Sequence, residues 1–337
     1  MNPTSQSPSP IRFFDIINGF QRTACMKGAL DLELFTAIAE GNSTPAQIAA
    51  RCGASERGIR ILCDYLTVEG FLSKNGNSYA LTQDTAIFLN RRSPAYMGGV
   101  VDFLLSPTIR KAFEDVAACV RNGGTVLSEH GSMEPENPVW VQFARAMAPM
   151  QSMTAQALAG HINKGSGRMK VLDIAAGHGL FGIEIAKQNP NAEIVALDWD
   201  SVLDVAREQA KAAGVTARYS TIAGSAFEKD FGTGYDAVLL TNFLHHFDPS
   251  TCESLLKKVY AALTPGGRAI TLDFVPNEDR ISPAVPAQFS MTMLTSTRSG
   301  DAYTFSEFKK MFGNSGFNRT EIAPLPPTFF SAITSYK

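Results

Sequence analysis

The stretch MKVLDIAAGHGLFGIEIAKQNP, residues 169–190, joins an apolar run to a glycine-rich turn and then to a second apolar pattern. Its first part, MKVLDIAAGHG, predicts a buried strand that ends in the turn, and LFGIEIAKQNP predicts the helix that follows. Gly177, Gly179 and Gly182 have the GxGxxG spacing, which allows a ligand to approach the backbone closely. The stretch therefore predicts a ligand site at the turn of an α/β domain.

Strands and helices alternate downstream of this unit. The strand segments are AEIVALDWD, ARYSTIAGSAF, YDAVLLTNFL and GGRAITLDFV, and the helical segments are VLDVAREQAKAAG and TCESLLKKVYAALTPGG. Such alternation predicts a parallel sheet with helices on both faces. The segment FNRTEIAPLPPTFFSAITSYK instead predicts two strands around a proline-rich turn, and hence an antiparallel terminal pair. The expected fold class is α/β, a Rossmann-like domain with a mostly parallel seven-stranded sheet and an antiparallel C-terminal strand.

The part of the chain that precedes residue 169 follows a different pattern, with helix after helix. Within it, Ser43 or Thr44 caps a short helix that starts at Pro45, and Ser55 caps a second helix. An Asn-Gly turn in FLSKNGNSYALT then predicts a hairpin. Two helices followed by a hairpin are typical of a winged helix.

A winged helix serves either to bind DNA or to pack and dimerise. Here the second helix pairs Arg57 and Arg60 with Glu56 and Asp64, and the wing offers only Lys74. This small excess of positive charge favours a dimerisation domain over a DNA-binding one. We expect a disordered lead at 1–10, the winged-helix dimerisation domain at 11–92, a helical linker that contributes to the substrate pocket at 93–163, and the ligand-binding domain at 164–337.

Composition excludes several classes of protein. A chain of 337 residues suits two domains, and no apolar run approaches the ~18 residues needed to cross a bilayer. The net charge of -2 gives no general attraction to nucleic acid or anionic lipid. Five cysteines without a CxxC pair predict neither a disulfide framework nor a metal site. The start MNPTSQSPSP lacks the features of a signal peptide, so we expect a cytoplasmic protein.

The glycine turn alone leaves a nicotinamide dehydrogenase open, because Asp198 lies 19 residues after Gly179. Asp173, inside the end of the first strand, suits a cationic group on the ligand instead. The motifs VLDIAAGHG, ALDWD, GSAF, LHHF and LTPGG resemble, in order and spacing, those of class I S-adenosylmethionine-dependent methyltransferases. With the winged-helix half, the whole chain resembles the plant-type small-molecule O-methyltransferases and their bacterial relatives in natural-product pathways, which form homodimers.

This resemblance implies S-adenosylmethionine as the cofactor and no metal. The cofactor-binding positions that it implies are Asp173, Gly177, Gly179, Asp198, Trp199, Ser225, Ala226, Phe227 and Thr241. By the resemblance, Asp198 accepts hydrogen bonds from the ribose hydroxyls and Asp173 lies near the amino group. Three positions depart from the family: Ala175 replaces a glycine, Ser225 replaces an aspartate that meets the adenine, and Thr241 replaces a lysine common in plant members.

The segment TNFLHHFD carries the residues that the resemblance implies for catalysis. His245 follows the fourth strand, at the sheet edge where ligands bind in open α/β folds. The resemblance makes it the general base that deprotonates a phenol, a task that suits a histidine with its ordinary pKa of about 6.5. The family has aspartate after this histidine, and here His246 takes that position. Counting without gaps places Asp273 as the carboxylate that holds the imidazole.

A second carboxylate of plant members aligns with Ala302 and is therefore absent, with Asp301 and Tyr303 open as substitutes. The residues expected to line a flat pocket for an aromatic or polyketide-like acceptor are Phe143, Met147, His246, Phe289 and Met293. The N-terminal Phe13, Phe14 and Phe20 are candidates to reach a partner subunit.

Three functions compete at this stage. The paired His245 and Asp273 favour O-methylation of a phenolic or enolic hydroxyl. The absent second carboxylate leaves open a C- or N-methyltransferase, or a relative that keeps the cofactor without methylating. A winged-helix regulator that senses a small ligand is disfavoured by the thin basic charge and by the full set of cofactor motifs.

Overall fold

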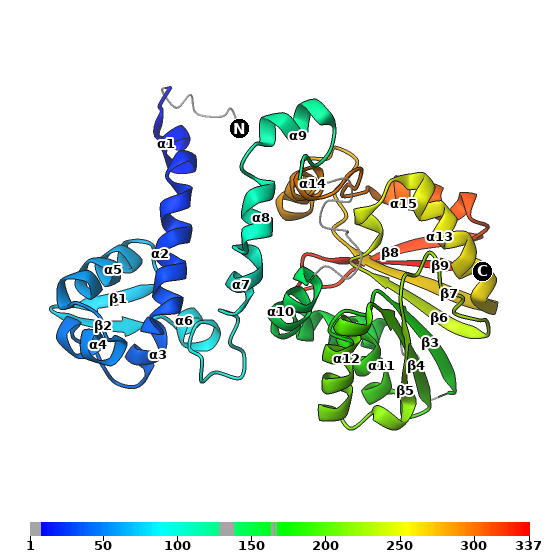
Figure 1. The fold of residues 1–337 in the computed structure, drawn as a ribbon, viewed down its shortest axis with the longest axis horizontal. Helices are drawn as coiled ribbons and strands as arrows, with labels where there is room; N and C mark the ends of the chain where they lie inside the picture. The colour runs from blue at the N-terminus through cyan, green and yellow to red at the C-terminus, as the bar shows by residue number, and fades with distance from the viewer. Residues whose placement is uncertain (1–7, 128–137, 163–164, 166) are drawn as a thin grey trace, which may run out of the picture. The chain divides into compact units, whose positions relative to one another are not determined.

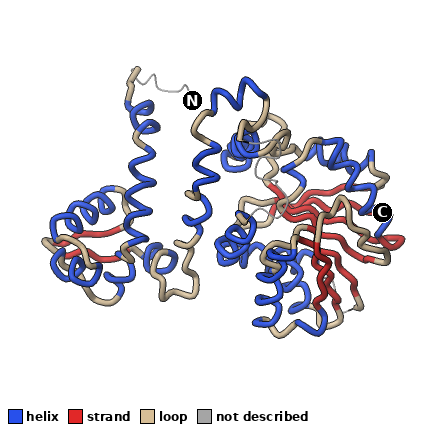
Figure 2. Tube along the Cα trace, viewed as in Figure 1, coloured by secondary structure: helices blue, strands red, loops and turns tan. Residues whose placement is uncertain are grey.

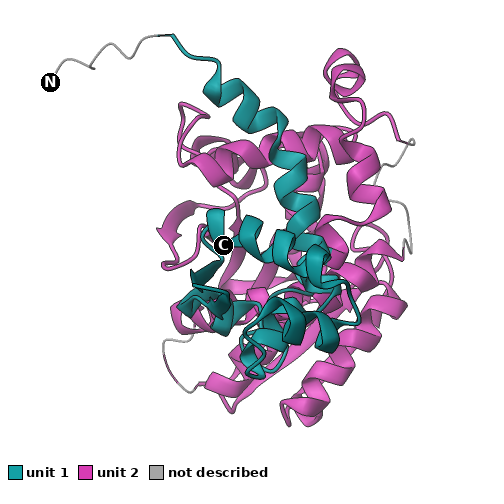
Figure 3. Ribbon diagram, turned by 90° about the vertical axis from the view of Figure 1, so that its left-hand side faces the viewer, with its two compact units in different colours: residues 1–101 teal, residues 102–337 magenta. Residues whose placement is uncertain are grey.

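The computed structural model describes residues 8–127, 138–162, 165 and 167–337. These residues form two compact units, 1–101 and 102–337 (Figure 3). Residues 102–162 thus group with the C-terminal unit. Most of the lead expected to be disordered, residues 1–7 of 1–10, lies outside the described residues.

The N-terminal unit is the expected winged helix. Its elements are α1 (Ile11–Ile17), α2 (Gly19–Asp31), α3 (Leu34–Ala39), α4 (Pro45–Cys52), α5 (Glu56–Val68), β1 (Leu72–Asn75), β2 (Ser78–Leu81) and α6 (Gln83–Phe88). Thr44 and Gln47 form a reciprocal capping box at the start of α4, and Ser55 accepts a hydrogen bond from the amide of Gly58 at the start of α5. In the hairpin Asn75 pairs with Ser78, so the turn is one residue later than the expected Asn-Gly pair.

In the described part of the chain, four helices lie between α6 and the sheet of the C-terminal unit. They are α7 (Val100–Leu104), which crosses the boundary between the units, α8 (Pro107–Ala112), α9 (Val116–Asn122) and α10 (Val139–Ile162). The long α10 carries a buried stripe with Ala144, Met147, Gln151, Ala155 and Leu158, at the spacing of one helix face.

The sheet has seven strands in the order β5-β4-β3-β6-β7-β9-β8 (Figure 1). The strands are β3 (Met169–Ile174), β4 (Ala192–Asp198), β5 (Tyr219–Ala223), β6 (Tyr235–Thr241), β7 (Leu263–Asp273), β8 (Arg319–Pro324) and β9 (Ser331–Tyr336). The first five are parallel, and β9 is antiparallel to both β7 and β8. This confirms the α/β fold class and its antiparallel end.

Helices connect and cover the strands (Figure 2). They are α11 (Leu180–Gln188), α12 (Asp200–Ala212), α13 (Pro249–Ala262), α14 (Ala284–Ser296) and α15 (Phe305–Asn314), with short 3-10 turns η2 (Thr216–Arg218) and η3 (Leu244–His246). Among the described residues, no helix combines the length and the apolar character that crossing a bilayer requires.

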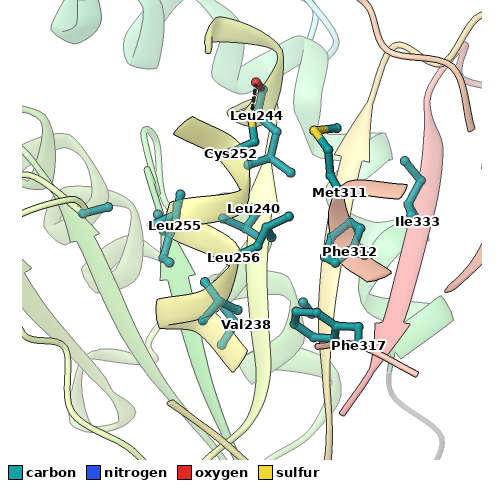
Figure 4. Packing of buried hydrophobic residues seen from close by; sticks show 14 of the residues in the cluster. Val238, Leu240, Leu244, Cys252, Leu255, Leu256, Met311, Phe312, Phe317 and Ile333 are labelled. Carbon is teal, nitrogen blue, oxygen red and sulfur yellow. Dashed lines mark hydrogen bonds between the residues drawn. The ribbon is translucent and has the colours of Figure 1, made fainter. Parts of the chain in front are cut away.

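Two apolar cores lie on opposite faces of the sheet. Val238 and Leu240 of β6 pack with α13 and α15, as Figure 4 shows, whereas Ala237 and Leu239 belong to the core with α10 and α11. Alternation of side chains along a strand explains why neighbouring residues enter different cores. The chain direction around the sheet reverses between β3 and β6, so the crevice at their carboxyl ends is the expected place for a ligand.

Candidate functional site

The turn after β3 has a backbone that favours glycine. Gly177 and Gly179 have φ values of 57° and 75°, in the left-handed region. A Cβ on Gly179 would lie 2.6 Å from the Tyr219 hydroxyl, so no larger residue fits there, whereas a Cβ on Gly177 would meet nothing closer than 3.9 Å. The left-handed φ rather than crowding therefore favours glycine at position 177. Ala175 also has a left-handed φ, 55°, which explains why glycine suits that position better.

Asp198 ends β4 and holds the turn. Its carboxylate accepts hydrogen bonds from the amides of Gly177, at 2.8 Å, and of Trp199, at 2.7 Å. Burial raises the pKa of Asp198 to about 6, although these two hydrogen bonds act in the opposite direction. The residue remains partly accessible, so a ligand with hydroxyl or cationic groups can meet it.

Asp173 lies on β3, the strand next to β4, and is fully buried beneath the turn. One of its oxygens accepts from the amide of Gly182 at 3.2 Å, and the other has no hydrogen-bond partner among the described residues. Burial raises the pKa of Asp173 to about 7. Together the two acids favour a positively charged ligand.

His178 completes the turn as a neutral residue. It is buried, burial lowers its pKa to about 4, and its Nδ1 accepts from the amide of Leu180 at 3.1 Å. Its side chain thus holds the start of α11.

The other expected cofactor residues come from the ends of neighbouring strands. Ser225, Ala226 and Phe227 follow β5, and the Ser225 hydroxyl accepts from the amide of Phe227 at 3.2 Å. The ring of Phe227 packs edge-on to Phe247 at 4.9 Å. Thr241 is the buried last residue of β6. These residues and the glycine turn thus follow strands at one edge of the sheet.

His245 and Asp273 meet at the same edge. His245 lies in η3 just after β6, and its Nδ1 is 2.6 Å from Oδ1 of Asp273, the last residue of β7. Both side chains are buried. Because a carboxylate accepts hydrogen bonds, the contact assigns the imidazole proton to Nδ1 and leaves Nε2 as an acceptor. This arrangement can take a proton from a ligand hydroxyl.

The neighbouring loop supports His245 through its backbone. The amide of Asp301 donates to the carbonyl oxygen of His245 at 3.0 Å. The Asp301 side chain pairs with Arg280 at 3.2 Å, and the Tyr303 hydroxyl donates to the carbonyl of Phe247. Asp301 and Tyr303, the two candidates to replace the second carboxylate, therefore both have other partners.

His246 lies beside His245, with ring centroids 4.3 Å apart. Its Nδ1 is buried and has no hydrogen-bond partner among the described residues. Trp140 packs edge-on to it at 5.5 Å. Trp140 was not predicted from the sequence, although its position three residues before Phe143 and seven before Met147 was a usable signal of a shared helix face.

Aromatic rings surround the two imidazoles. Phe289 packs edge-on to His245 with a ring-centroid distance of 4.9 Å, and Phe274 stacks on Phe289 with a centroid distance of 3.8 Å. The ring centroid of Phe143 lies 5.9 Å from that of Trp140, the ring that packs on His246. Of the other expected pocket residues, Met147 and Met293 are buried, on α10 and α14. Phe274 also went unnoticed in the sequence, since only the fold places it next to Phe289.

Among the residues that the structure describes, no group of three or more His, Cys, Asp or Glu side chains is arranged to hold a metal ion.

Two family models match the chain. The O-methyltransferase domain matches residues 113–318, and the O-methyltransferase dimerisation domain matches residues 14–91. Among curated proteins, the chain is 28% identical to 3-hydroxy-5-methyl-1-naphthoate 3-O-methyltransferase of Streptomyces sahachiroi, over 91% of this chain and 89% of that one. It is 25% identical to the tetracenomycin polyketide synthesis 8-O-methyl transferase of Streptomyces glaucescens, over 97% of this chain and 98% of that one.

Solved structures give the same picture. A crystal structure of a candidate O-methyltransferase from Nostoc punctiforme PCC 73102 superposes with a TM-score of 0.96 at 52% identity, covering 98% of this chain and 100% of that one. Human N-acetylserotonin methyltransferase, solved with its SAM ligand, gives 0.86 at 22% identity, covering 99% of both chains, which shows a common fold.

Proposed function

Because the chain belongs to the family of O-methyltransferases that carry an N-terminal dimerisation domain, we propose that it methylates a hydroxyl of a small aromatic or polyketide-like acceptor. The enzyme is a methyltransferase, and the cofactor of its family is S-adenosylmethionine. The observation that supports the choice of a hydroxyl is the buried contact of 2.6 Å between His245 and Asp273. This pair is suited to removing the proton of a hydroxyl group.

The residues around the glycine turn fit S-adenosylmethionine. A Cβ on Gly177 would meet nothing closer than 3.9 Å, Asp198 is partly accessible, and one oxygen of the buried Asp173 has no hydrogen-bond partner among the described residues. In this proposal Asp198 binds the ribose hydroxyls and the charge of Asp173 attracts the amino group. Ser225, Ala226 and Phe227 then flank the adenine. When bound, the cofactor supplies an electrophilic methyl group on a positively charged sulfur.

His245 acts as the general base. Its Nε2 accepts the proton of the acceptor hydroxyl, and Asp273 stabilises the imidazolium that forms. A neutral phenol is a weak nucleophile, since the ordinary phenol pKa is about 10. The backbone contact from Asp301 holds His245 in place, which keeps its imidazole positioned to accept the proton of the hydroxyl.

The acceptor is a flat apolar molecule in this proposal. Phe289 packs on His245 and Trp140 on His246, with Phe143 behind Trp140, and aromatic walls with few polar groups are typical of such sites. The names of the two Streptomyces relatives, a naphthoate and a tetracenomycin O-methyltransferase, fit acceptors of this kind.

The protein forms a homodimer through its N-terminal unit. Helix α1 has no buried residue, and its large apolar side chains are exposed, with Ile11 at 74%, Phe13 at 62% and Phe14 at 55%. Phe20 in α2 is exposed at 68%. A second copy of the chain provides the apolar surface that these side chains lack. DNA is a poor alternative partner, because Arg60 and Lys74 both pair with Asp64.

The first test is calorimetric titration of S-adenosylmethionine and S-adenosylhomocysteine, followed by a screen of phenols and polyketides for methyl transfer. Micromolar binding is expected, with a large loss in Asp198→Asn and little change in the matched surface variant Asp204→Asn. Binding of NAD in place of both sulfur compounds would overturn the proposal. Sedimentation analysis of the wild type against Phe13→Glu and Phe14→Glu tests the homodimer.

A C-methyltransferase is the second candidate. The side chains of Asp301 and Tyr303 have other partners, so His245 lacks the second carboxylate of plant members. One relative, 26% identical over 94% of this chain and 89% of that one, is an L-tyrosine C(3)-methyltransferase of Streptomyces lavendulae. Carbon-13 NMR of the methylated product separates the two candidates, because methoxy and ring-methyl carbons resonate far apart.

A further inference from the structure

The side chain of Lys258 reaches from α13 to the turn that follows β5. Its Nζ donates to the carbonyl oxygens of Ala226 at 2.9 Å, Phe227 at 3.2 Å and Lys229 at 2.8 Å. An ammonium group has three N–H donors, and here three acceptors meet them. The cation of Lys258 is therefore fully occupied by one short piece of backbone, residues 225–229, which we call the β5 turn.

The β5 turn is also held at its start. The amide of Gly224 donates to the carbonyl oxygen of Asp198 at 2.9 Å, which ties the turn to the end of β4. Within the turn, the carbonyl oxygen of Ser225 accepts from the amide of Lys229 at 2.9 Å. The β5 turn is thus attached to β4 on one side and, through Lys258, to α13 on the other.

Apolar packing does not replace the cation in this contact. Ala226 belongs to the same buried core as Leu255 and Val259 of α13, but such packing has no preferred direction. Three carbonyl dipoles that point at one place repel one another, and a cation between them turns this repulsion into charge-assisted hydrogen bonds. Loss of the charge therefore frees the peptide groups of the β5 turn to rotate.

We propose, on the basis of the proposed function, that Lys258 is a positioning residue for the cofactor, because its ammonium group fixes the turn that flanks the adenine. Peptide groups recognise the edge of a flat heterocycle only while their directions are fixed. The affinity for the cofactor and the preference for adenine over other bases both depend on Lys258 in this way.

Hydrogen exchange of the protein without ligand tests whether Lys258 fixes the β5 turn. Lys258→Met keeps the unbranched apolar stem and removes the three donors. Amides of the β5 turn are expected to exchange about 10- to 100-fold faster in this variant, the range for losing hydrogen bonds to one charged group. Mass spectrometry of peptides that contain the turn measures the exchange.

Arg218 provides a matched control. It lies in η2, and its guanidinium donates to the carbonyl oxygens of Ala186, Asn189 and Ala192, where α11 ends and β4 begins. Arg218→Met therefore removes a cation from three carbonyl groups at the opposite edge of the sheet. Exchange in the β5 turn is expected to stay at the wild-type rate in this variant.

Calorimetry then tests what the turn does for the cofactor. The two ligands are S-adenosylhomocysteine and S-inosylhomocysteine, in which an oxygen replaces the amine of adenine, and the wild type is expected to bind the first more tightly. Lys258→Met is expected to weaken binding of S-adenosylhomocysteine by about 10- to 100-fold and to bring the ratio of the two Kd values close to one. Lys258→Arg keeps a cation and is expected to recover part of the ratio. Arg218→Met is expected to keep the wild-type ratio, because a general loss of stability weakens both ligands equally.

Four results overturn the inference: unchanged exchange of the β5 turn in Lys258→Met, unchanged affinity for S-adenosylhomocysteine in that variant, the same losses in Arg218→Met, or no preference between the two ligands in the wild type. Failure of the proposed function looks different. In that case no hydroxyl compound is methylated, while both effects of Lys258→Met, on exchange and on the ratio of Kd values, remain.

Discussion

Gly300 lies directly against the backbone carbonyl oxygen of His245. A Cβ at position 300 would come within 2.2 Å of that oxygen and 2.9 Å of the carbonyl carbon of His246. Both neighbours are backbone atoms, which cannot turn away as a flexible side chain does. The loop that carries Gly300 therefore fixes the position of both imidazoles.

Gly300→Ala is expected to lower kcat by about 100-fold, because displacement of a base by about 1 Å is enough for such a loss. Steady-state kinetics with the best acceptor measures it, with cofactor titration as a check that the fold is intact. Gly313→Ala in α15 is the matched control, since a Cβ there meets nothing within 4 Å. A Gly300→Ala enzyme with wild-type kcat would show that the loop does not position the base.

His245→Ala and Asp273→Asn are each expected to reduce kcat by about 100- to 10,000-fold, the usual range for a general base and the group that orients it. The affinity for S-adenosylhomocysteine is expected to stay within a few-fold of wild type, which separates a chemical defect from a binding defect. Single-turnover assays measure the chemical step. Turnover unchanged in both variants would exclude this pair from proton transfer.

Ala175→Gly is expected to stabilise the protein by about 0.5–1 kcal/mol, because the left-handed conformation at φ 55° costs an alanine more than the added chain entropy costs a glycine. Ala176→Gly is the matched control and is expected to destabilise by about 1–2 kcal/mol, since Ala176 is buried and does not have a positive φ. Urea denaturation without cofactor compares the two. Equal losses in both variants would contradict the strain at Ala175.

Cofactor binding is expected to weaken as the pH falls from 7.5 to 5. Burial raises the pKa of Asp173 to about 7 and that of Asp198 to about 6, so each acid gains a proton across this range and loses the charge that attracts a cation. Each protonated group lowers the affinity by up to about tenfold per pH unit below its pKa. Titrations in buffers of different ionisation enthalpy are expected to show proton release near pH 6.

The variant Asp173→Asn isolates the upper part of this pH dependence. It is expected to flatten the response between pH 6 and 7.5 while leaving the response below pH 6, which belongs to Asp198. A Kd that stays constant from pH 7.5 to 5 in the wild type would show that neither acid acts on the ligand.

Local patterns in the sequence predicted most of the fold, because the patterns and the contacts are both local. Thr44 caps α4 by a hydrogen bond with Gln47, three residues away. The strand and helix in residues 169–190 could likewise be predicted from the pattern of short segments. Asp273 was identified through the resemblance to the methyltransferase family, by counting without gaps from His245. The sequence placed the hairpin turn one residue too early, at Asn75 and Gly76, because these two residues match a common turn pair. Only the pairing of the two strands shows that Asn75 still pairs with Ser78.

The rest of the site depends on contacts between distant segments. Phe274 and Phe289 stack across 15 positions, and the close approach of Gly300 to His245 depends on how the loop folds back. The missing partner of His246 is also a property of the packed structure, since a sequence shows which polar groups exist but not which stay unpaired.

The antiparallel strand β9 has a consequence for how the protein is made. It lies between β7 and β8, four of its six residues are buried, and Ser331 pairs with Asp273. Because β9 follows the eight other described strands in the chain, it leaves the ribosome after them. Until then β7 presents an unpaired edge beside Asp273, and such edges invite aggregation. Chaperone protection of the nascent chain should therefore matter most between the synthesis of β7 and the synthesis of β9.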